Sequence, residues 1–435
     1  MSKPSLNTPS LGLPELIAIG VGGMIGGGIF SVLGIAVGIA GHAAPFAFVL
    51  GGLIAILSGY SYVKLALAYR DDGASFTYLE RAFPNHINIA GMMGWTIVVG
   101  YIGTLSLYAF TFGAYGADLF GSAGSHTVRL FLSIFILLVF LVVNLRGARS
   151  SGLTEDLIVY TKIALLALVG AFALRTVSEE RLTPVFNEGF GSIFIAGAMV
   201  FVAFEGFELL TNAVIETKDP VRNLPRGIYI SIGATTLIYL LLSFVAVGSL
   251  TQEEMVQAKE YALAAAARPA LGEAGTVLVG LAAMLATASA INATTFGASR
   301  LMSKIATEHM LPHAFSFRNK DADVPEFAMI VFVTLGIVFT SLGSLEIIAT
   351  FSSLTFLIIT LGVSVANYML RAKTRANPAI VLVGITVVLV TIALLIWHMW
   401  TAKPKLLYSI TGLYSVILIG ELTFTERRIF FRKHH

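Results

Sequence analysis

The chain contains no cysteine, and this absence excludes several kinds of chemistry. Without thiols there is no disulfide framework, no thiolate metal site and no cysteine nucleophile. The redox state of the surrounding compartment therefore cannot be inferred from cysteine usage in this sequence.

Charged side chains are scarce as well. Asp, Glu, Lys and Arg make up 12% of the 435 residues, and hydrophobic residues make up 56%. A soluble globular domain carries about 25% charged residues. Together with a mean hydropathy of +0.84, this composition excludes a soluble globule and predicts an all-α polytopic membrane protein. The net charge of +3 comes from basic residues in the loops and does not indicate nucleic-acid binding.

Hydropathy predicts twelve membrane spans, because a crossing helix needs about 20 apolar residues. The predicted spans cover residues 13–39, 45–68, 89–120, 127–145, 155–175, 191–215, 227–249, 273–304, 325–343, 346–370, 379–400 and 406–424. Of the 28 Lys and Arg residues, 20 then fall on one side of the bilayer, 7 on the other, and Lys162 within a span. Positive charge favours the cytoplasmic side, so we predict a plasma-membrane protein with both termini in the cytoplasm.

Glycine is concentrated in the first predicted span, in the stretch GVGGMIGGGIFS from Gly20 to Ser31. An interior Gly costs a helix about 1 kcal/mol relative to Ala, so this cluster favours a break in the helix. A break frees backbone groups that lipid cannot satisfy, and many secondary transporters hold their substrate at such a break. The alternative interpretation is close helix packing through small residues.

A second break is predicted in the sixth span, where Gly206 lies between two carboxylates in an apolar run. The first and sixth spans each begin a set of five. Interrupted helices at corresponding positions indicate inverted repeats with a binding site at their interface. The predicted units are residues 1–175, residues 191–370, and residues 379–435 with two further helices and a cytoplasmic tail.

Three charged residues lie within predicted spans, where each costs about 2.5–3.5 kcal/mol on insertion scales. Lys162 either snorkels to the membrane surface or is desolvated in the bundle, where burial disfavours its charged form and lets it exchange protons. Glu205 and Glu208 would repel each other on one face of an intact helix but can point apart at an unwound turn. We expect one to be a neutral, hydrogen-bonded acid. The other is expected to carry a proton or to contact a substrate amino group.

The two breaks together predict a site for a zwitterion. Half-helix N-termini attract carboxylates, and no side chain blocks the amides of Gly26, Gly27 and Gly28. The predicted acceptors for an ammonium group are the backbone carbonyls near Met24, Val202 and Glu205. Aromatic residues that either cap this site or serve only packing are Phe204, Phe207 and Tyr108. The expected small-molecule substrate is therefore an α-amino acid.

The stretch from Thr251 to Gly275 is Ala-rich and amphipathic. It predicts a helical segment on the outer face of the protein. The segment is either a lid over the transport path or a surface helix with no gating role.

Three motifs resemble those of the amino acid–polyamine–organocation superfamily of transporters. They are MIGGGIF at 24–30, FEGFELLTNAVIETKDPVRNLPRGI at 204–228 and SAINATTFGASRLMSKIATEHMLP at 289–312. The resemblance covers nearly the whole chain and is greatest to the proton-coupled, broad-specificity amino acid transporters of the superfamily. It implies a leucine-transporter-type fold with a five-plus-five inverted repeat, discontinuous helices 1 and 6, and two additional C-terminal helices.

The resemblance also implies roles in proton coupling. In similar transporters a lysine of the fifth span takes the place of a bound sodium ion, and Lys162 matches it. The implied partners of Lys162 are the carbonyl of Gly22 and the side chain of Ser289. Glu208 matches an acid implicated in the pH response of related exchangers.

The sequence departs from the superfamily pattern at three places. Gly27 and Gly28 lack a hydroxyl that usually contacts the substrate carboxylate. Glu205 stands where relatives carry an apolar residue, which opens the site to cationic substrates. Val202 replaces a bulky aromatic residue before the second break and suggests different gating.

We therefore predict an amino acid transporter that works by proton-coupled, sodium-independent alternating access in the lipid bilayer. Protons are the expected coupling ion, with no cofactor, no metal and no obligate protein partner. The alternatives are a proton-independent exchanger of amino acids or polyamines and a non-transporting membrane sensor. Enzyme chemistry is not expected, since the histidines of the folded region are scattered near span ends and form no ligand set: His42, His86, His126, His309, His313 and His398.

Overall fold

A computed structural model describes residues 11–71, 74–84, 87–146, 152–319 and 324–432. These residues form helices and turns, with an isolated β-bridge between Leu11 and Thr217. The predicted all-α fold is thus confirmed over the described part of the chain. The two chain ends that the charge count assigns to the cytoplasm, 1–10 and 433–435, lie outside the described residues.

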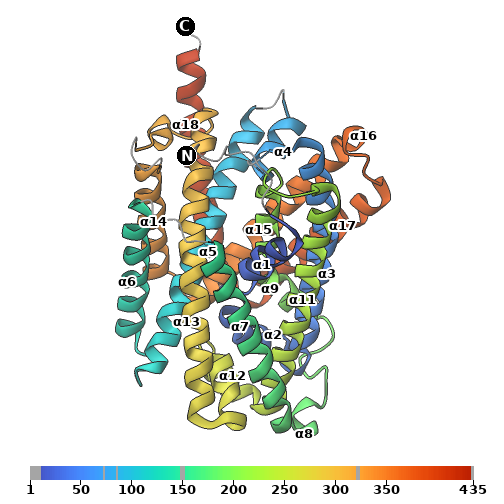
Figure 1. Ribbon diagram of the computed structural model, residues 1–435, viewed down its shortest axis with the longest axis vertical. Coiled ribbons are helices and arrows are strands. Elements are labelled where there is room, and N and C mark those ends of the chain that lie inside the picture. Colours follow the sequence, from blue (N-terminus) through green and yellow to red (C-terminus); the bar gives the residue numbers. More distant parts are fainter. Residues whose placement is uncertain (1–10, 72–73, 85–86, 147–151, 320–323, 433–435) are drawn as a thin grey trace, which may run out of the picture.

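The first half of the chain contains the interrupted first helix and four further long helices (Figure 1). Its elements are α1 (Leu13–Met24), α2 (Gly28–Ala40), η1 (Gly41–Ala43), α3 (Ala44–Tyr69), α4 (Ala74–Ala82), α5 (Ile87–Leu119), α6 (His126–Leu145), α7 (Gly152–Ala173), η2 (Leu174–Thr176) and α8 (Glu179–Leu182). The predicted first span therefore consists of two short helices, α1 and α2.

The second half begins with the other interrupted helix. Its elements are α9 (Ser192–Val200), η3 (Phe201–Ala203), η4 (Glu205–Glu208), α10 (Leu209–Asn212), α11 (Pro220–Ser249), α12 (Gln252–Gln257), α13 (Ala262–Thr307), η5 (His313–Ser316), α14 (Glu326–Leu342), α15 (Leu345–Met369), α16 (Arg371–Thr374), α17 (Pro378–Ala402) and α18 (Pro404–Arg432).

Each of the twelve predicted spans overlaps a helix or a broken helix. Within the described residues, nine helical stretches are long and apolar enough to cross a membrane, one of them joining α2 and α3. A tenth is formed if Ser192–Ala203 and Glu205–Asn212, bent by 46°, count as one span. Two apolar helices, α1 and α14, are shorter.

Two helix boundaries differ from the sequence-based prediction. The seventh span was expected to begin at residue 227, but α11 begins at Pro220, because proline is compatible with the first turn of a helix. The eighth span was expected to begin at 273, but α13 begins at Ala262 and contains a kink at Gly272, whose φ of 60° suits glycine. Helix α12 and the start of α13, up to this kink, lie within the stretch from Thr251 to Gly275 that was predicted to be helical.

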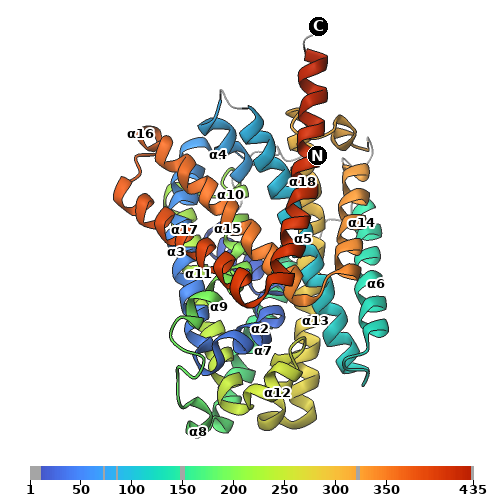
Figure 2. The ribbon, with the colours of Figure 1, turned by 180° about the vertical axis from the view of Figure 1, so that it is seen from behind.

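Helix α5 lies at the centre of the bundle, where it packs against α13, α15, α6 and α14 (Figures 1 and 2). Its most apolar window is 89% buried, whereas that of α18 is 17% buried. Large apolar side chains on the outer helices are exposed, including Phe131 and Trp400. Such continuous exposed apolar surface is typical of contact with a membrane or a partner.

The two ends of the molecule differ in structure. Helices α8 and α12 lie at one end, which we call the α12 end, and α4 and α16 lie at the other, which we call the α4 end (Figures 1 and 2). The broken helices α1–α2 and α9–α10 lie between these ends. Residue contacts join α1 to η4 and α2 to α9, so the two interruptions are adjacent.

Candidate functional site

The first break exposes a run of backbone amides. The amide of Ile25 is the last to bond into α1, donating to the Val21 carbonyl at 2.8 Å, and the amide of Ser31 donates to the Gly27 carbonyl at 2.9 Å. Within the described part of the chain, the amides of Gly26, Gly27 and Gly28 donate no hydrogen bond to another residue, whereas the amide of Ile29 donates to the hydroxyl of Tyr239. The first amides of any helix lack partners within that helix. The N-terminus of α2 therefore presents free donors in a buried turn, at the glycines predicted to bind a carboxylate.

The last carbonyls of α1 are also released by the break, and other helices supply their partners. The ammonium Nζ of Lys162 donates to the Gly22 carbonyl at 2.9 Å. The hydroxyl of Tyr239 is 2.7 Å from the Met24 carbonyl oxygen and 3.1 Å from that of Ala203. Tyr239 thus bridges the two broken helices from α11.

Tyr239 was not among the residues predicted from the sequence. The sequence does contain an indication of its role, because Tyr239 lies in the apolar run of α11 and a buried tyrosine hydroxyl usually forms a hydrogen bond. Its contact leaves the Met24 carbonyl only one further lone pair for the predicted substrate ammonium group.

The glycines of the first break divide into two groups. Gly20, Gly22 and Gly23 lie within α1, where an added methyl group would press on neighbouring helices: at Gly22, for example, it would lie 2.7 Å from a methyl group of Val159. Gly26 to Gly28 form the turn and the start of α2. The packing and the break interpretations therefore each hold for part of the stretch.

The second break lies directly against the first. A methyl group at Gly206 would overlap the carbonyl carbon of Gly23 and the amide nitrogen of Met24. A methyl group at Gly28 would lie 2.7 Å from the Cβ of Ala203. Glycine at positions 28 and 206 is what allows the two interrupted backbones to meet.

The predicted aromatic residues separate in the fold. Tyr108 of α5 lies on the first break, because a methyl group at Gly27 would overlap its ring. Phe204 packs edge-on against Tyr239 with ring centroids 5.3 Å apart. Phe207 packs in the same way against Tyr62, also at 5.3 Å. Phe204 therefore packs against α11, and Phe207 packs against α3. Val202 is also buried and belongs to the hydrophobic core.

Lys162, in the middle of α7, is 3% exposed, so its side chain lies inside the bundle. The neighbouring Val159 packs on Gly22, which brings α7 close enough for the contact with the carbonyl. Ser289 is half-buried on α13. The adjacent Ala290 faces the first break, 2.8 Å from where a Cβ of Gly26 would lie. The direct contact between Lys162 and Ser289 stays a prediction.

Glu205 and Glu208 are both buried and face different helices. Thr360 of α15 donates to Oε1 of Glu208 at 3.4 Å, and Tyr62 of α3 lies beside the same carboxyl group. Glu205 lies near Thr104 of α5, and its Oε2 has no hydrogen-bond partner among the described residues. Each carboxyl group therefore has a hydroxyl beside it, and Oε2 of Glu205 remains as a free acceptor, while the separate roles expected of the two acids stay predictions.

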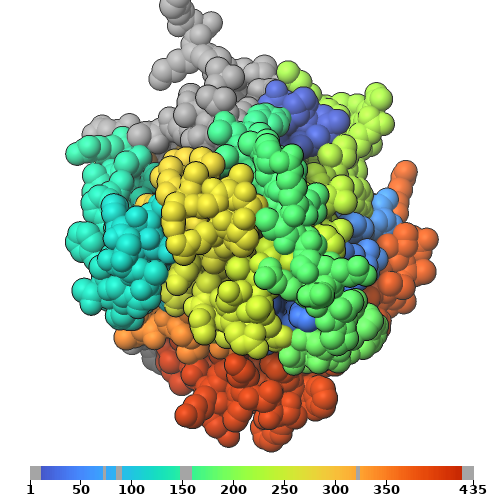
Figure 3. Space-filling model, turned by 90° about the horizontal axis from the view of Figure 1, so that it is seen from below, coloured from blue at the N-terminus to red at the C-terminus, as the bar shows by residue number. Residues whose placement is uncertain are grey.

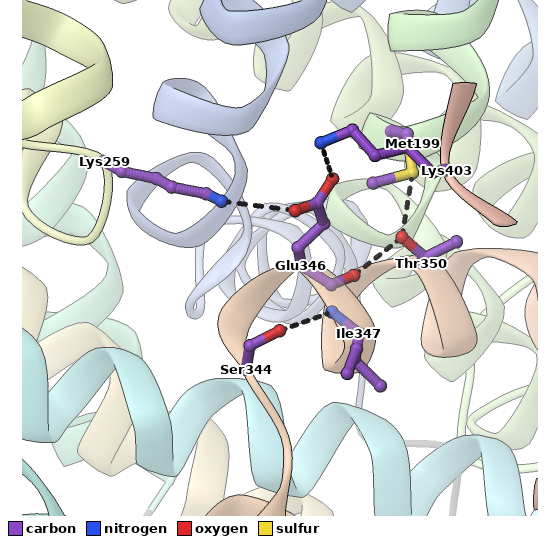
Figure 4. Close-up of polar contacts among 7 residues, drawn as sticks. All are labelled: Met199, Lys259, Ser344, Glu346, Ile347, Thr350 and Lys403. Carbon is purple, nitrogen blue, oxygen red and sulfur yellow. Dashed lines mark hydrogen bonds and ion pairs between the residues drawn. The ribbon is translucent and has the colours of Figure 1, made fainter. Parts of the chain in front are cut away.

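A polar cluster lies at the α12 end. Glu346, at the start of α15, accepts hydrogen bonds from Lys403 at 2.9 Å and from Lys259 at 3.4 Å (Figure 4). The backbone of Lys259 lies against α2, 2.5 Å from where a Cβ of Gly34 would be. The segment after α12 is therefore held against α2 and α15. A cavity of about 520 Å³ lies between these elements, α9 and α17.

A separate ion pair links helices at the α4 end. The Nζ of Lys304, near the end of α13, lies 2.5 Å from Oδ1 of Asp71, which follows α3. The hydroxyl of Thr77 in α4 donates to the same carboxylate at 2.9 Å. Polar contacts therefore join different helices on both sides of the paired breaks.

Comparison with known proteins gives consistent matches. The family described as amino acid permease matches residues 11–420. The inner membrane transport protein YbaT of Escherichia coli is 31% identical over 416 residues, covering 94% of this chain and 95% of YbaT. The branched-chain amino acid permease BcaP of Bacillus subtilis is 25% identical, covering 85% of this chain and 82% of BcaP. The serine/threonine exchanger SteT of the same organism is 27% identical, covering 70% of this chain and 69% of SteT.

Proposed function

Since the chain belongs to the amino acid permease family, and is therefore a multi-pass membrane transporter and not an enzyme, we propose that it takes up amino acids by proton-coupled, sodium-independent alternating access. The substrate lies where the broken helices meet. Its carboxylate is held by the amides of Gly26, Gly27 and Gly28, and no cofactor other than the coupling proton is required.

The observation that carries this proposal is the run of free amides in a buried turn. Buried backbone amides are nearly always hydrogen-bonded, so three consecutive amides without an acceptor among the described residues, those of Gly26, Gly27 and Gly28, call for a ligand that accepts hydrogen bonds. A carboxylate at a helix N-terminus also gains from the helix dipole. The ammonium group of the same substrate then faces the remaining lone pairs of the Met24, Val202 and Glu205 carbonyls and the free Oε2 of Glu205.

Coupling to protons rests on Lys162. Its charged form donates to the Gly22 carbonyl and so stabilises the arrangement in which α7 lies against α1. Loss of its proton replaces a charge-assisted hydrogen bond by a weaker one. A proton can drive a conformational change only through such a difference between two states. Glu208 and Ser289 complete the proposed coupling group, Glu208 as an acid beside the second break and Ser289 as a hydroxyl on α13.

The proposed orientation puts the α12 end outside the plasma membrane and the α4 end in the cytoplasm. Residues 1–175 and 191–370 form the two inverted repeats, and residues 379–435 add the peripheral helices α17 and α18. The paired breaks then lie between an outer closure at Glu346 and an inner closure at Asp71 and Lys304.

The test is uptake of a labelled amino-acid panel into proteoliposomes, measured under an inward proton gradient and separately under a sodium gradient. We expect accumulation with protons alone and none with sodium alone. Accumulation that requires sodium would contradict the proposal.

The second candidate is a proton-independent exchanger of amino acids or polyamines. It is favoured by the free carboxylate oxygen of Glu205, which suits a cationic group, and by the similarity to a protein described as an exchanger. An exchanger would take up label only into vesicles preloaded with substrate, whatever the gradient. Competition by putrescine, lysine and alanine then identifies the substrate class.

A further inference from the structure

A second cavity lies at the α12 end, away from the broken helices. Its volume is about 360 Å³. It is a partly open cavity lined by α5, the start of α6, the residues before α13 and the turn between α14 and α15. Figure 3 views the molecule from this end, where the cyan turn before α6 lies beside the yellow segment that leads into α13. The polar side chains that line the cavity are Ser125, His126, Arg129, Glu260, Tyr261, Ser341 and Ser344.

Arg129 is the unusual member of this lining. It is 5% exposed, and its guanidinium group lies over the ring of Phe110 with 3.8 Å between Cζ and the ring centroid. Its Nη1 is fully buried without a hydrogen-bond partner in the described part of the chain. Gly113 fixes this position, because a methyl group there would overlap the Arg129 carbonyl, so α6 lies directly on α5.

A buried guanidinium group without acceptors is energetically costly. Removing such a charge from water is unfavourable, and stacking on an aromatic ring offsets only part of that cost. Arginine has five N–H donors in a planar fork that matches the two oxygens of a carboxylate or phosphate. The cavity therefore contains an unused anion-binding group.

A carboxylate lines the same cavity. Glu260 precedes α13, and its burial raises the pKa of the carboxyl group, against the influence of Arg129, Lys259 and His126. Arg129 and Glu260 form no ion pair with each other or with another described residue within 4.0 Å. Opposite charges thus share one cavity without direct contact, and a ligand between them can pair with both.

We propose that this cavity binds a small ligand group that carries an oxyanion next to an ammonium, with the oxyanion on Arg129 and the ammonium on Glu260. Two sources provide this chemistry at a membrane surface: a free α-amino acid and the headgroup of an aminophospholipid. The site contains none of the residues assigned to transport at the helix breaks, so its occupancy does not depend on the transport proposal.

Because the chain lacks cysteine, one introduced thiol can report on the cavity. The variant Ser341→Cys replaces a small hydroxyl on the lining and is reconstituted in phosphatidylcholine nanodiscs. The rate of maleimide labelling is measured with L-alanine, glycerophosphoethanolamine or propionate. A ligand at about twice its dissociation constant fills about two-thirds of the sites, so we expect labelling to slow about threefold. The matched control is Glu180→Cys on α8, at the same end, whose labelling should not change.

The pattern of protection identifies the source of the ligand and the roles of Arg129 and Glu260 in binding it. Protection by L-alanine identifies a free amino acid, and protection by glycerophosphoethanolamine identifies a lipid headgroup. Adding Arg129→Met should abolish protection by either, and Arg129→Lys should restore part of it. Glu260→Gln should remove the advantage of L-alanine over propionate. No protection by any probe, or protection that persists in Arg129→Met, would overturn the proposal. Labelling is independent of transport, so the two proposals can fail separately.

Discussion

At the scale of single residues, the site is organised by backbone groups that the helix breaks release. The Gly22 carbonyl is bonded to a lysine and the Met24 carbonyl to a tyrosine, each from another helix. An unpaired polar group in a bilayer costs several kcal/mol, which explains why Lys162 and Tyr239 are buried. The amides of Gly26, Gly27 and Gly28 have no such partner among the described residues, and this asymmetry supports the proposed carboxylate site.

Replacing Lys162 by alanine tests its proposed role. The Gly22 carbonyl loses its charged partner, so we expect proton-driven uptake to fall to background while the protein still elutes as a folded species. Uptake into proteoliposomes under a proton gradient is the measurement. Lys64→Ala, which alters a partly exposed lysine of α3, is the matched control and should transport normally. Undiminished proton-driven uptake by Lys162→Ala would rule out the role.

Replacing Gly206 by alanine tests the contact between the two breaks. The added methyl group overlaps the backbone at Gly23 and Met24, and that backbone cannot yield as a flexible side chain can. Overpacking of this kind costs about 1–3 kcal/mol or more, so we expect a lower melting temperature and loss of uptake. Gly233→Ala in α11 is the control, because a methyl group there meets no atom within 4 Å. Equal behaviour of the two variants would contradict the close approach.

At the scale of elements, the segment after α12 acts as a cover whose attachment depends on Glu346. That carboxylate forms ion pairs with Lys259 of the cover and with Lys403 in the turn between α17 and α18 (Figure 4). The cover also lies on α2, the half-helix that carries the proposed carboxylate site. Under the proposed alternating access, opening of the α12 end requires these ionic contacts to separate, which favours the lid over a passive surface helix.

The variant Glu346→Gln should shift the molecule toward opening at the α12 end. A partly exposed ion pair contributes about 0.2–1 kcal/mol, and 1 kcal/mol corresponds to roughly a fivefold change in an equilibrium constant. We expect Ser192→Cys, which lines the adjacent cavity, to react with maleimide about two to five times faster when Glu346→Gln is added. Glu273→Gln, which breaks an exposed pair with Arg268, should leave the rate unchanged. A slower or unaltered rate in Glu346→Gln would argue against the lid.

At the scale of the whole molecule, the bundle has a buried centre around α5 and an apolar periphery formed by helices such as α6, α17 and α18. This arrangement fits a multi-pass membrane protein. The distribution of lysine and arginine supports the proposed orientation, because basic residues favour the cytoplasmic side. The α4 end, with Arg371 and Lys373 on α16, is the end that this rule assigns to the cytoplasm.

The orientation can be measured with two single-cysteine variants. In intact cells, a membrane-impermeant maleimide should label Glu180→Cys on α8 and should not label Ala372→Cys on α16 until the cells are permeabilised. Both residues are exposed, so access to the reagent depends on the side of the membrane. The reverse pattern would invert the proposed topology and would place Arg129 and Glu260 on the cytoplasmic side.

The sequence by itself determined where the chain is apolar for long enough to cross a membrane and where its helices cannot continue. Both properties are local. The length of an apolar run can be counted in the sequence, and Gly26–Gly28 destabilise a helix whatever it packs against. The contact of Lys162 with Gly22 was expected from family resemblance, and not from spacing. Only the tertiary structure decided which glycines serve packing, which phenol bridges the breaks, and that Nη1 of Arg129 is buried without an acceptor among the described residues. Those outcomes depend on residues far apart in the chain, such as Tyr239 and Met24, and a burial or a hydrogen bond exists only once both partners are in place.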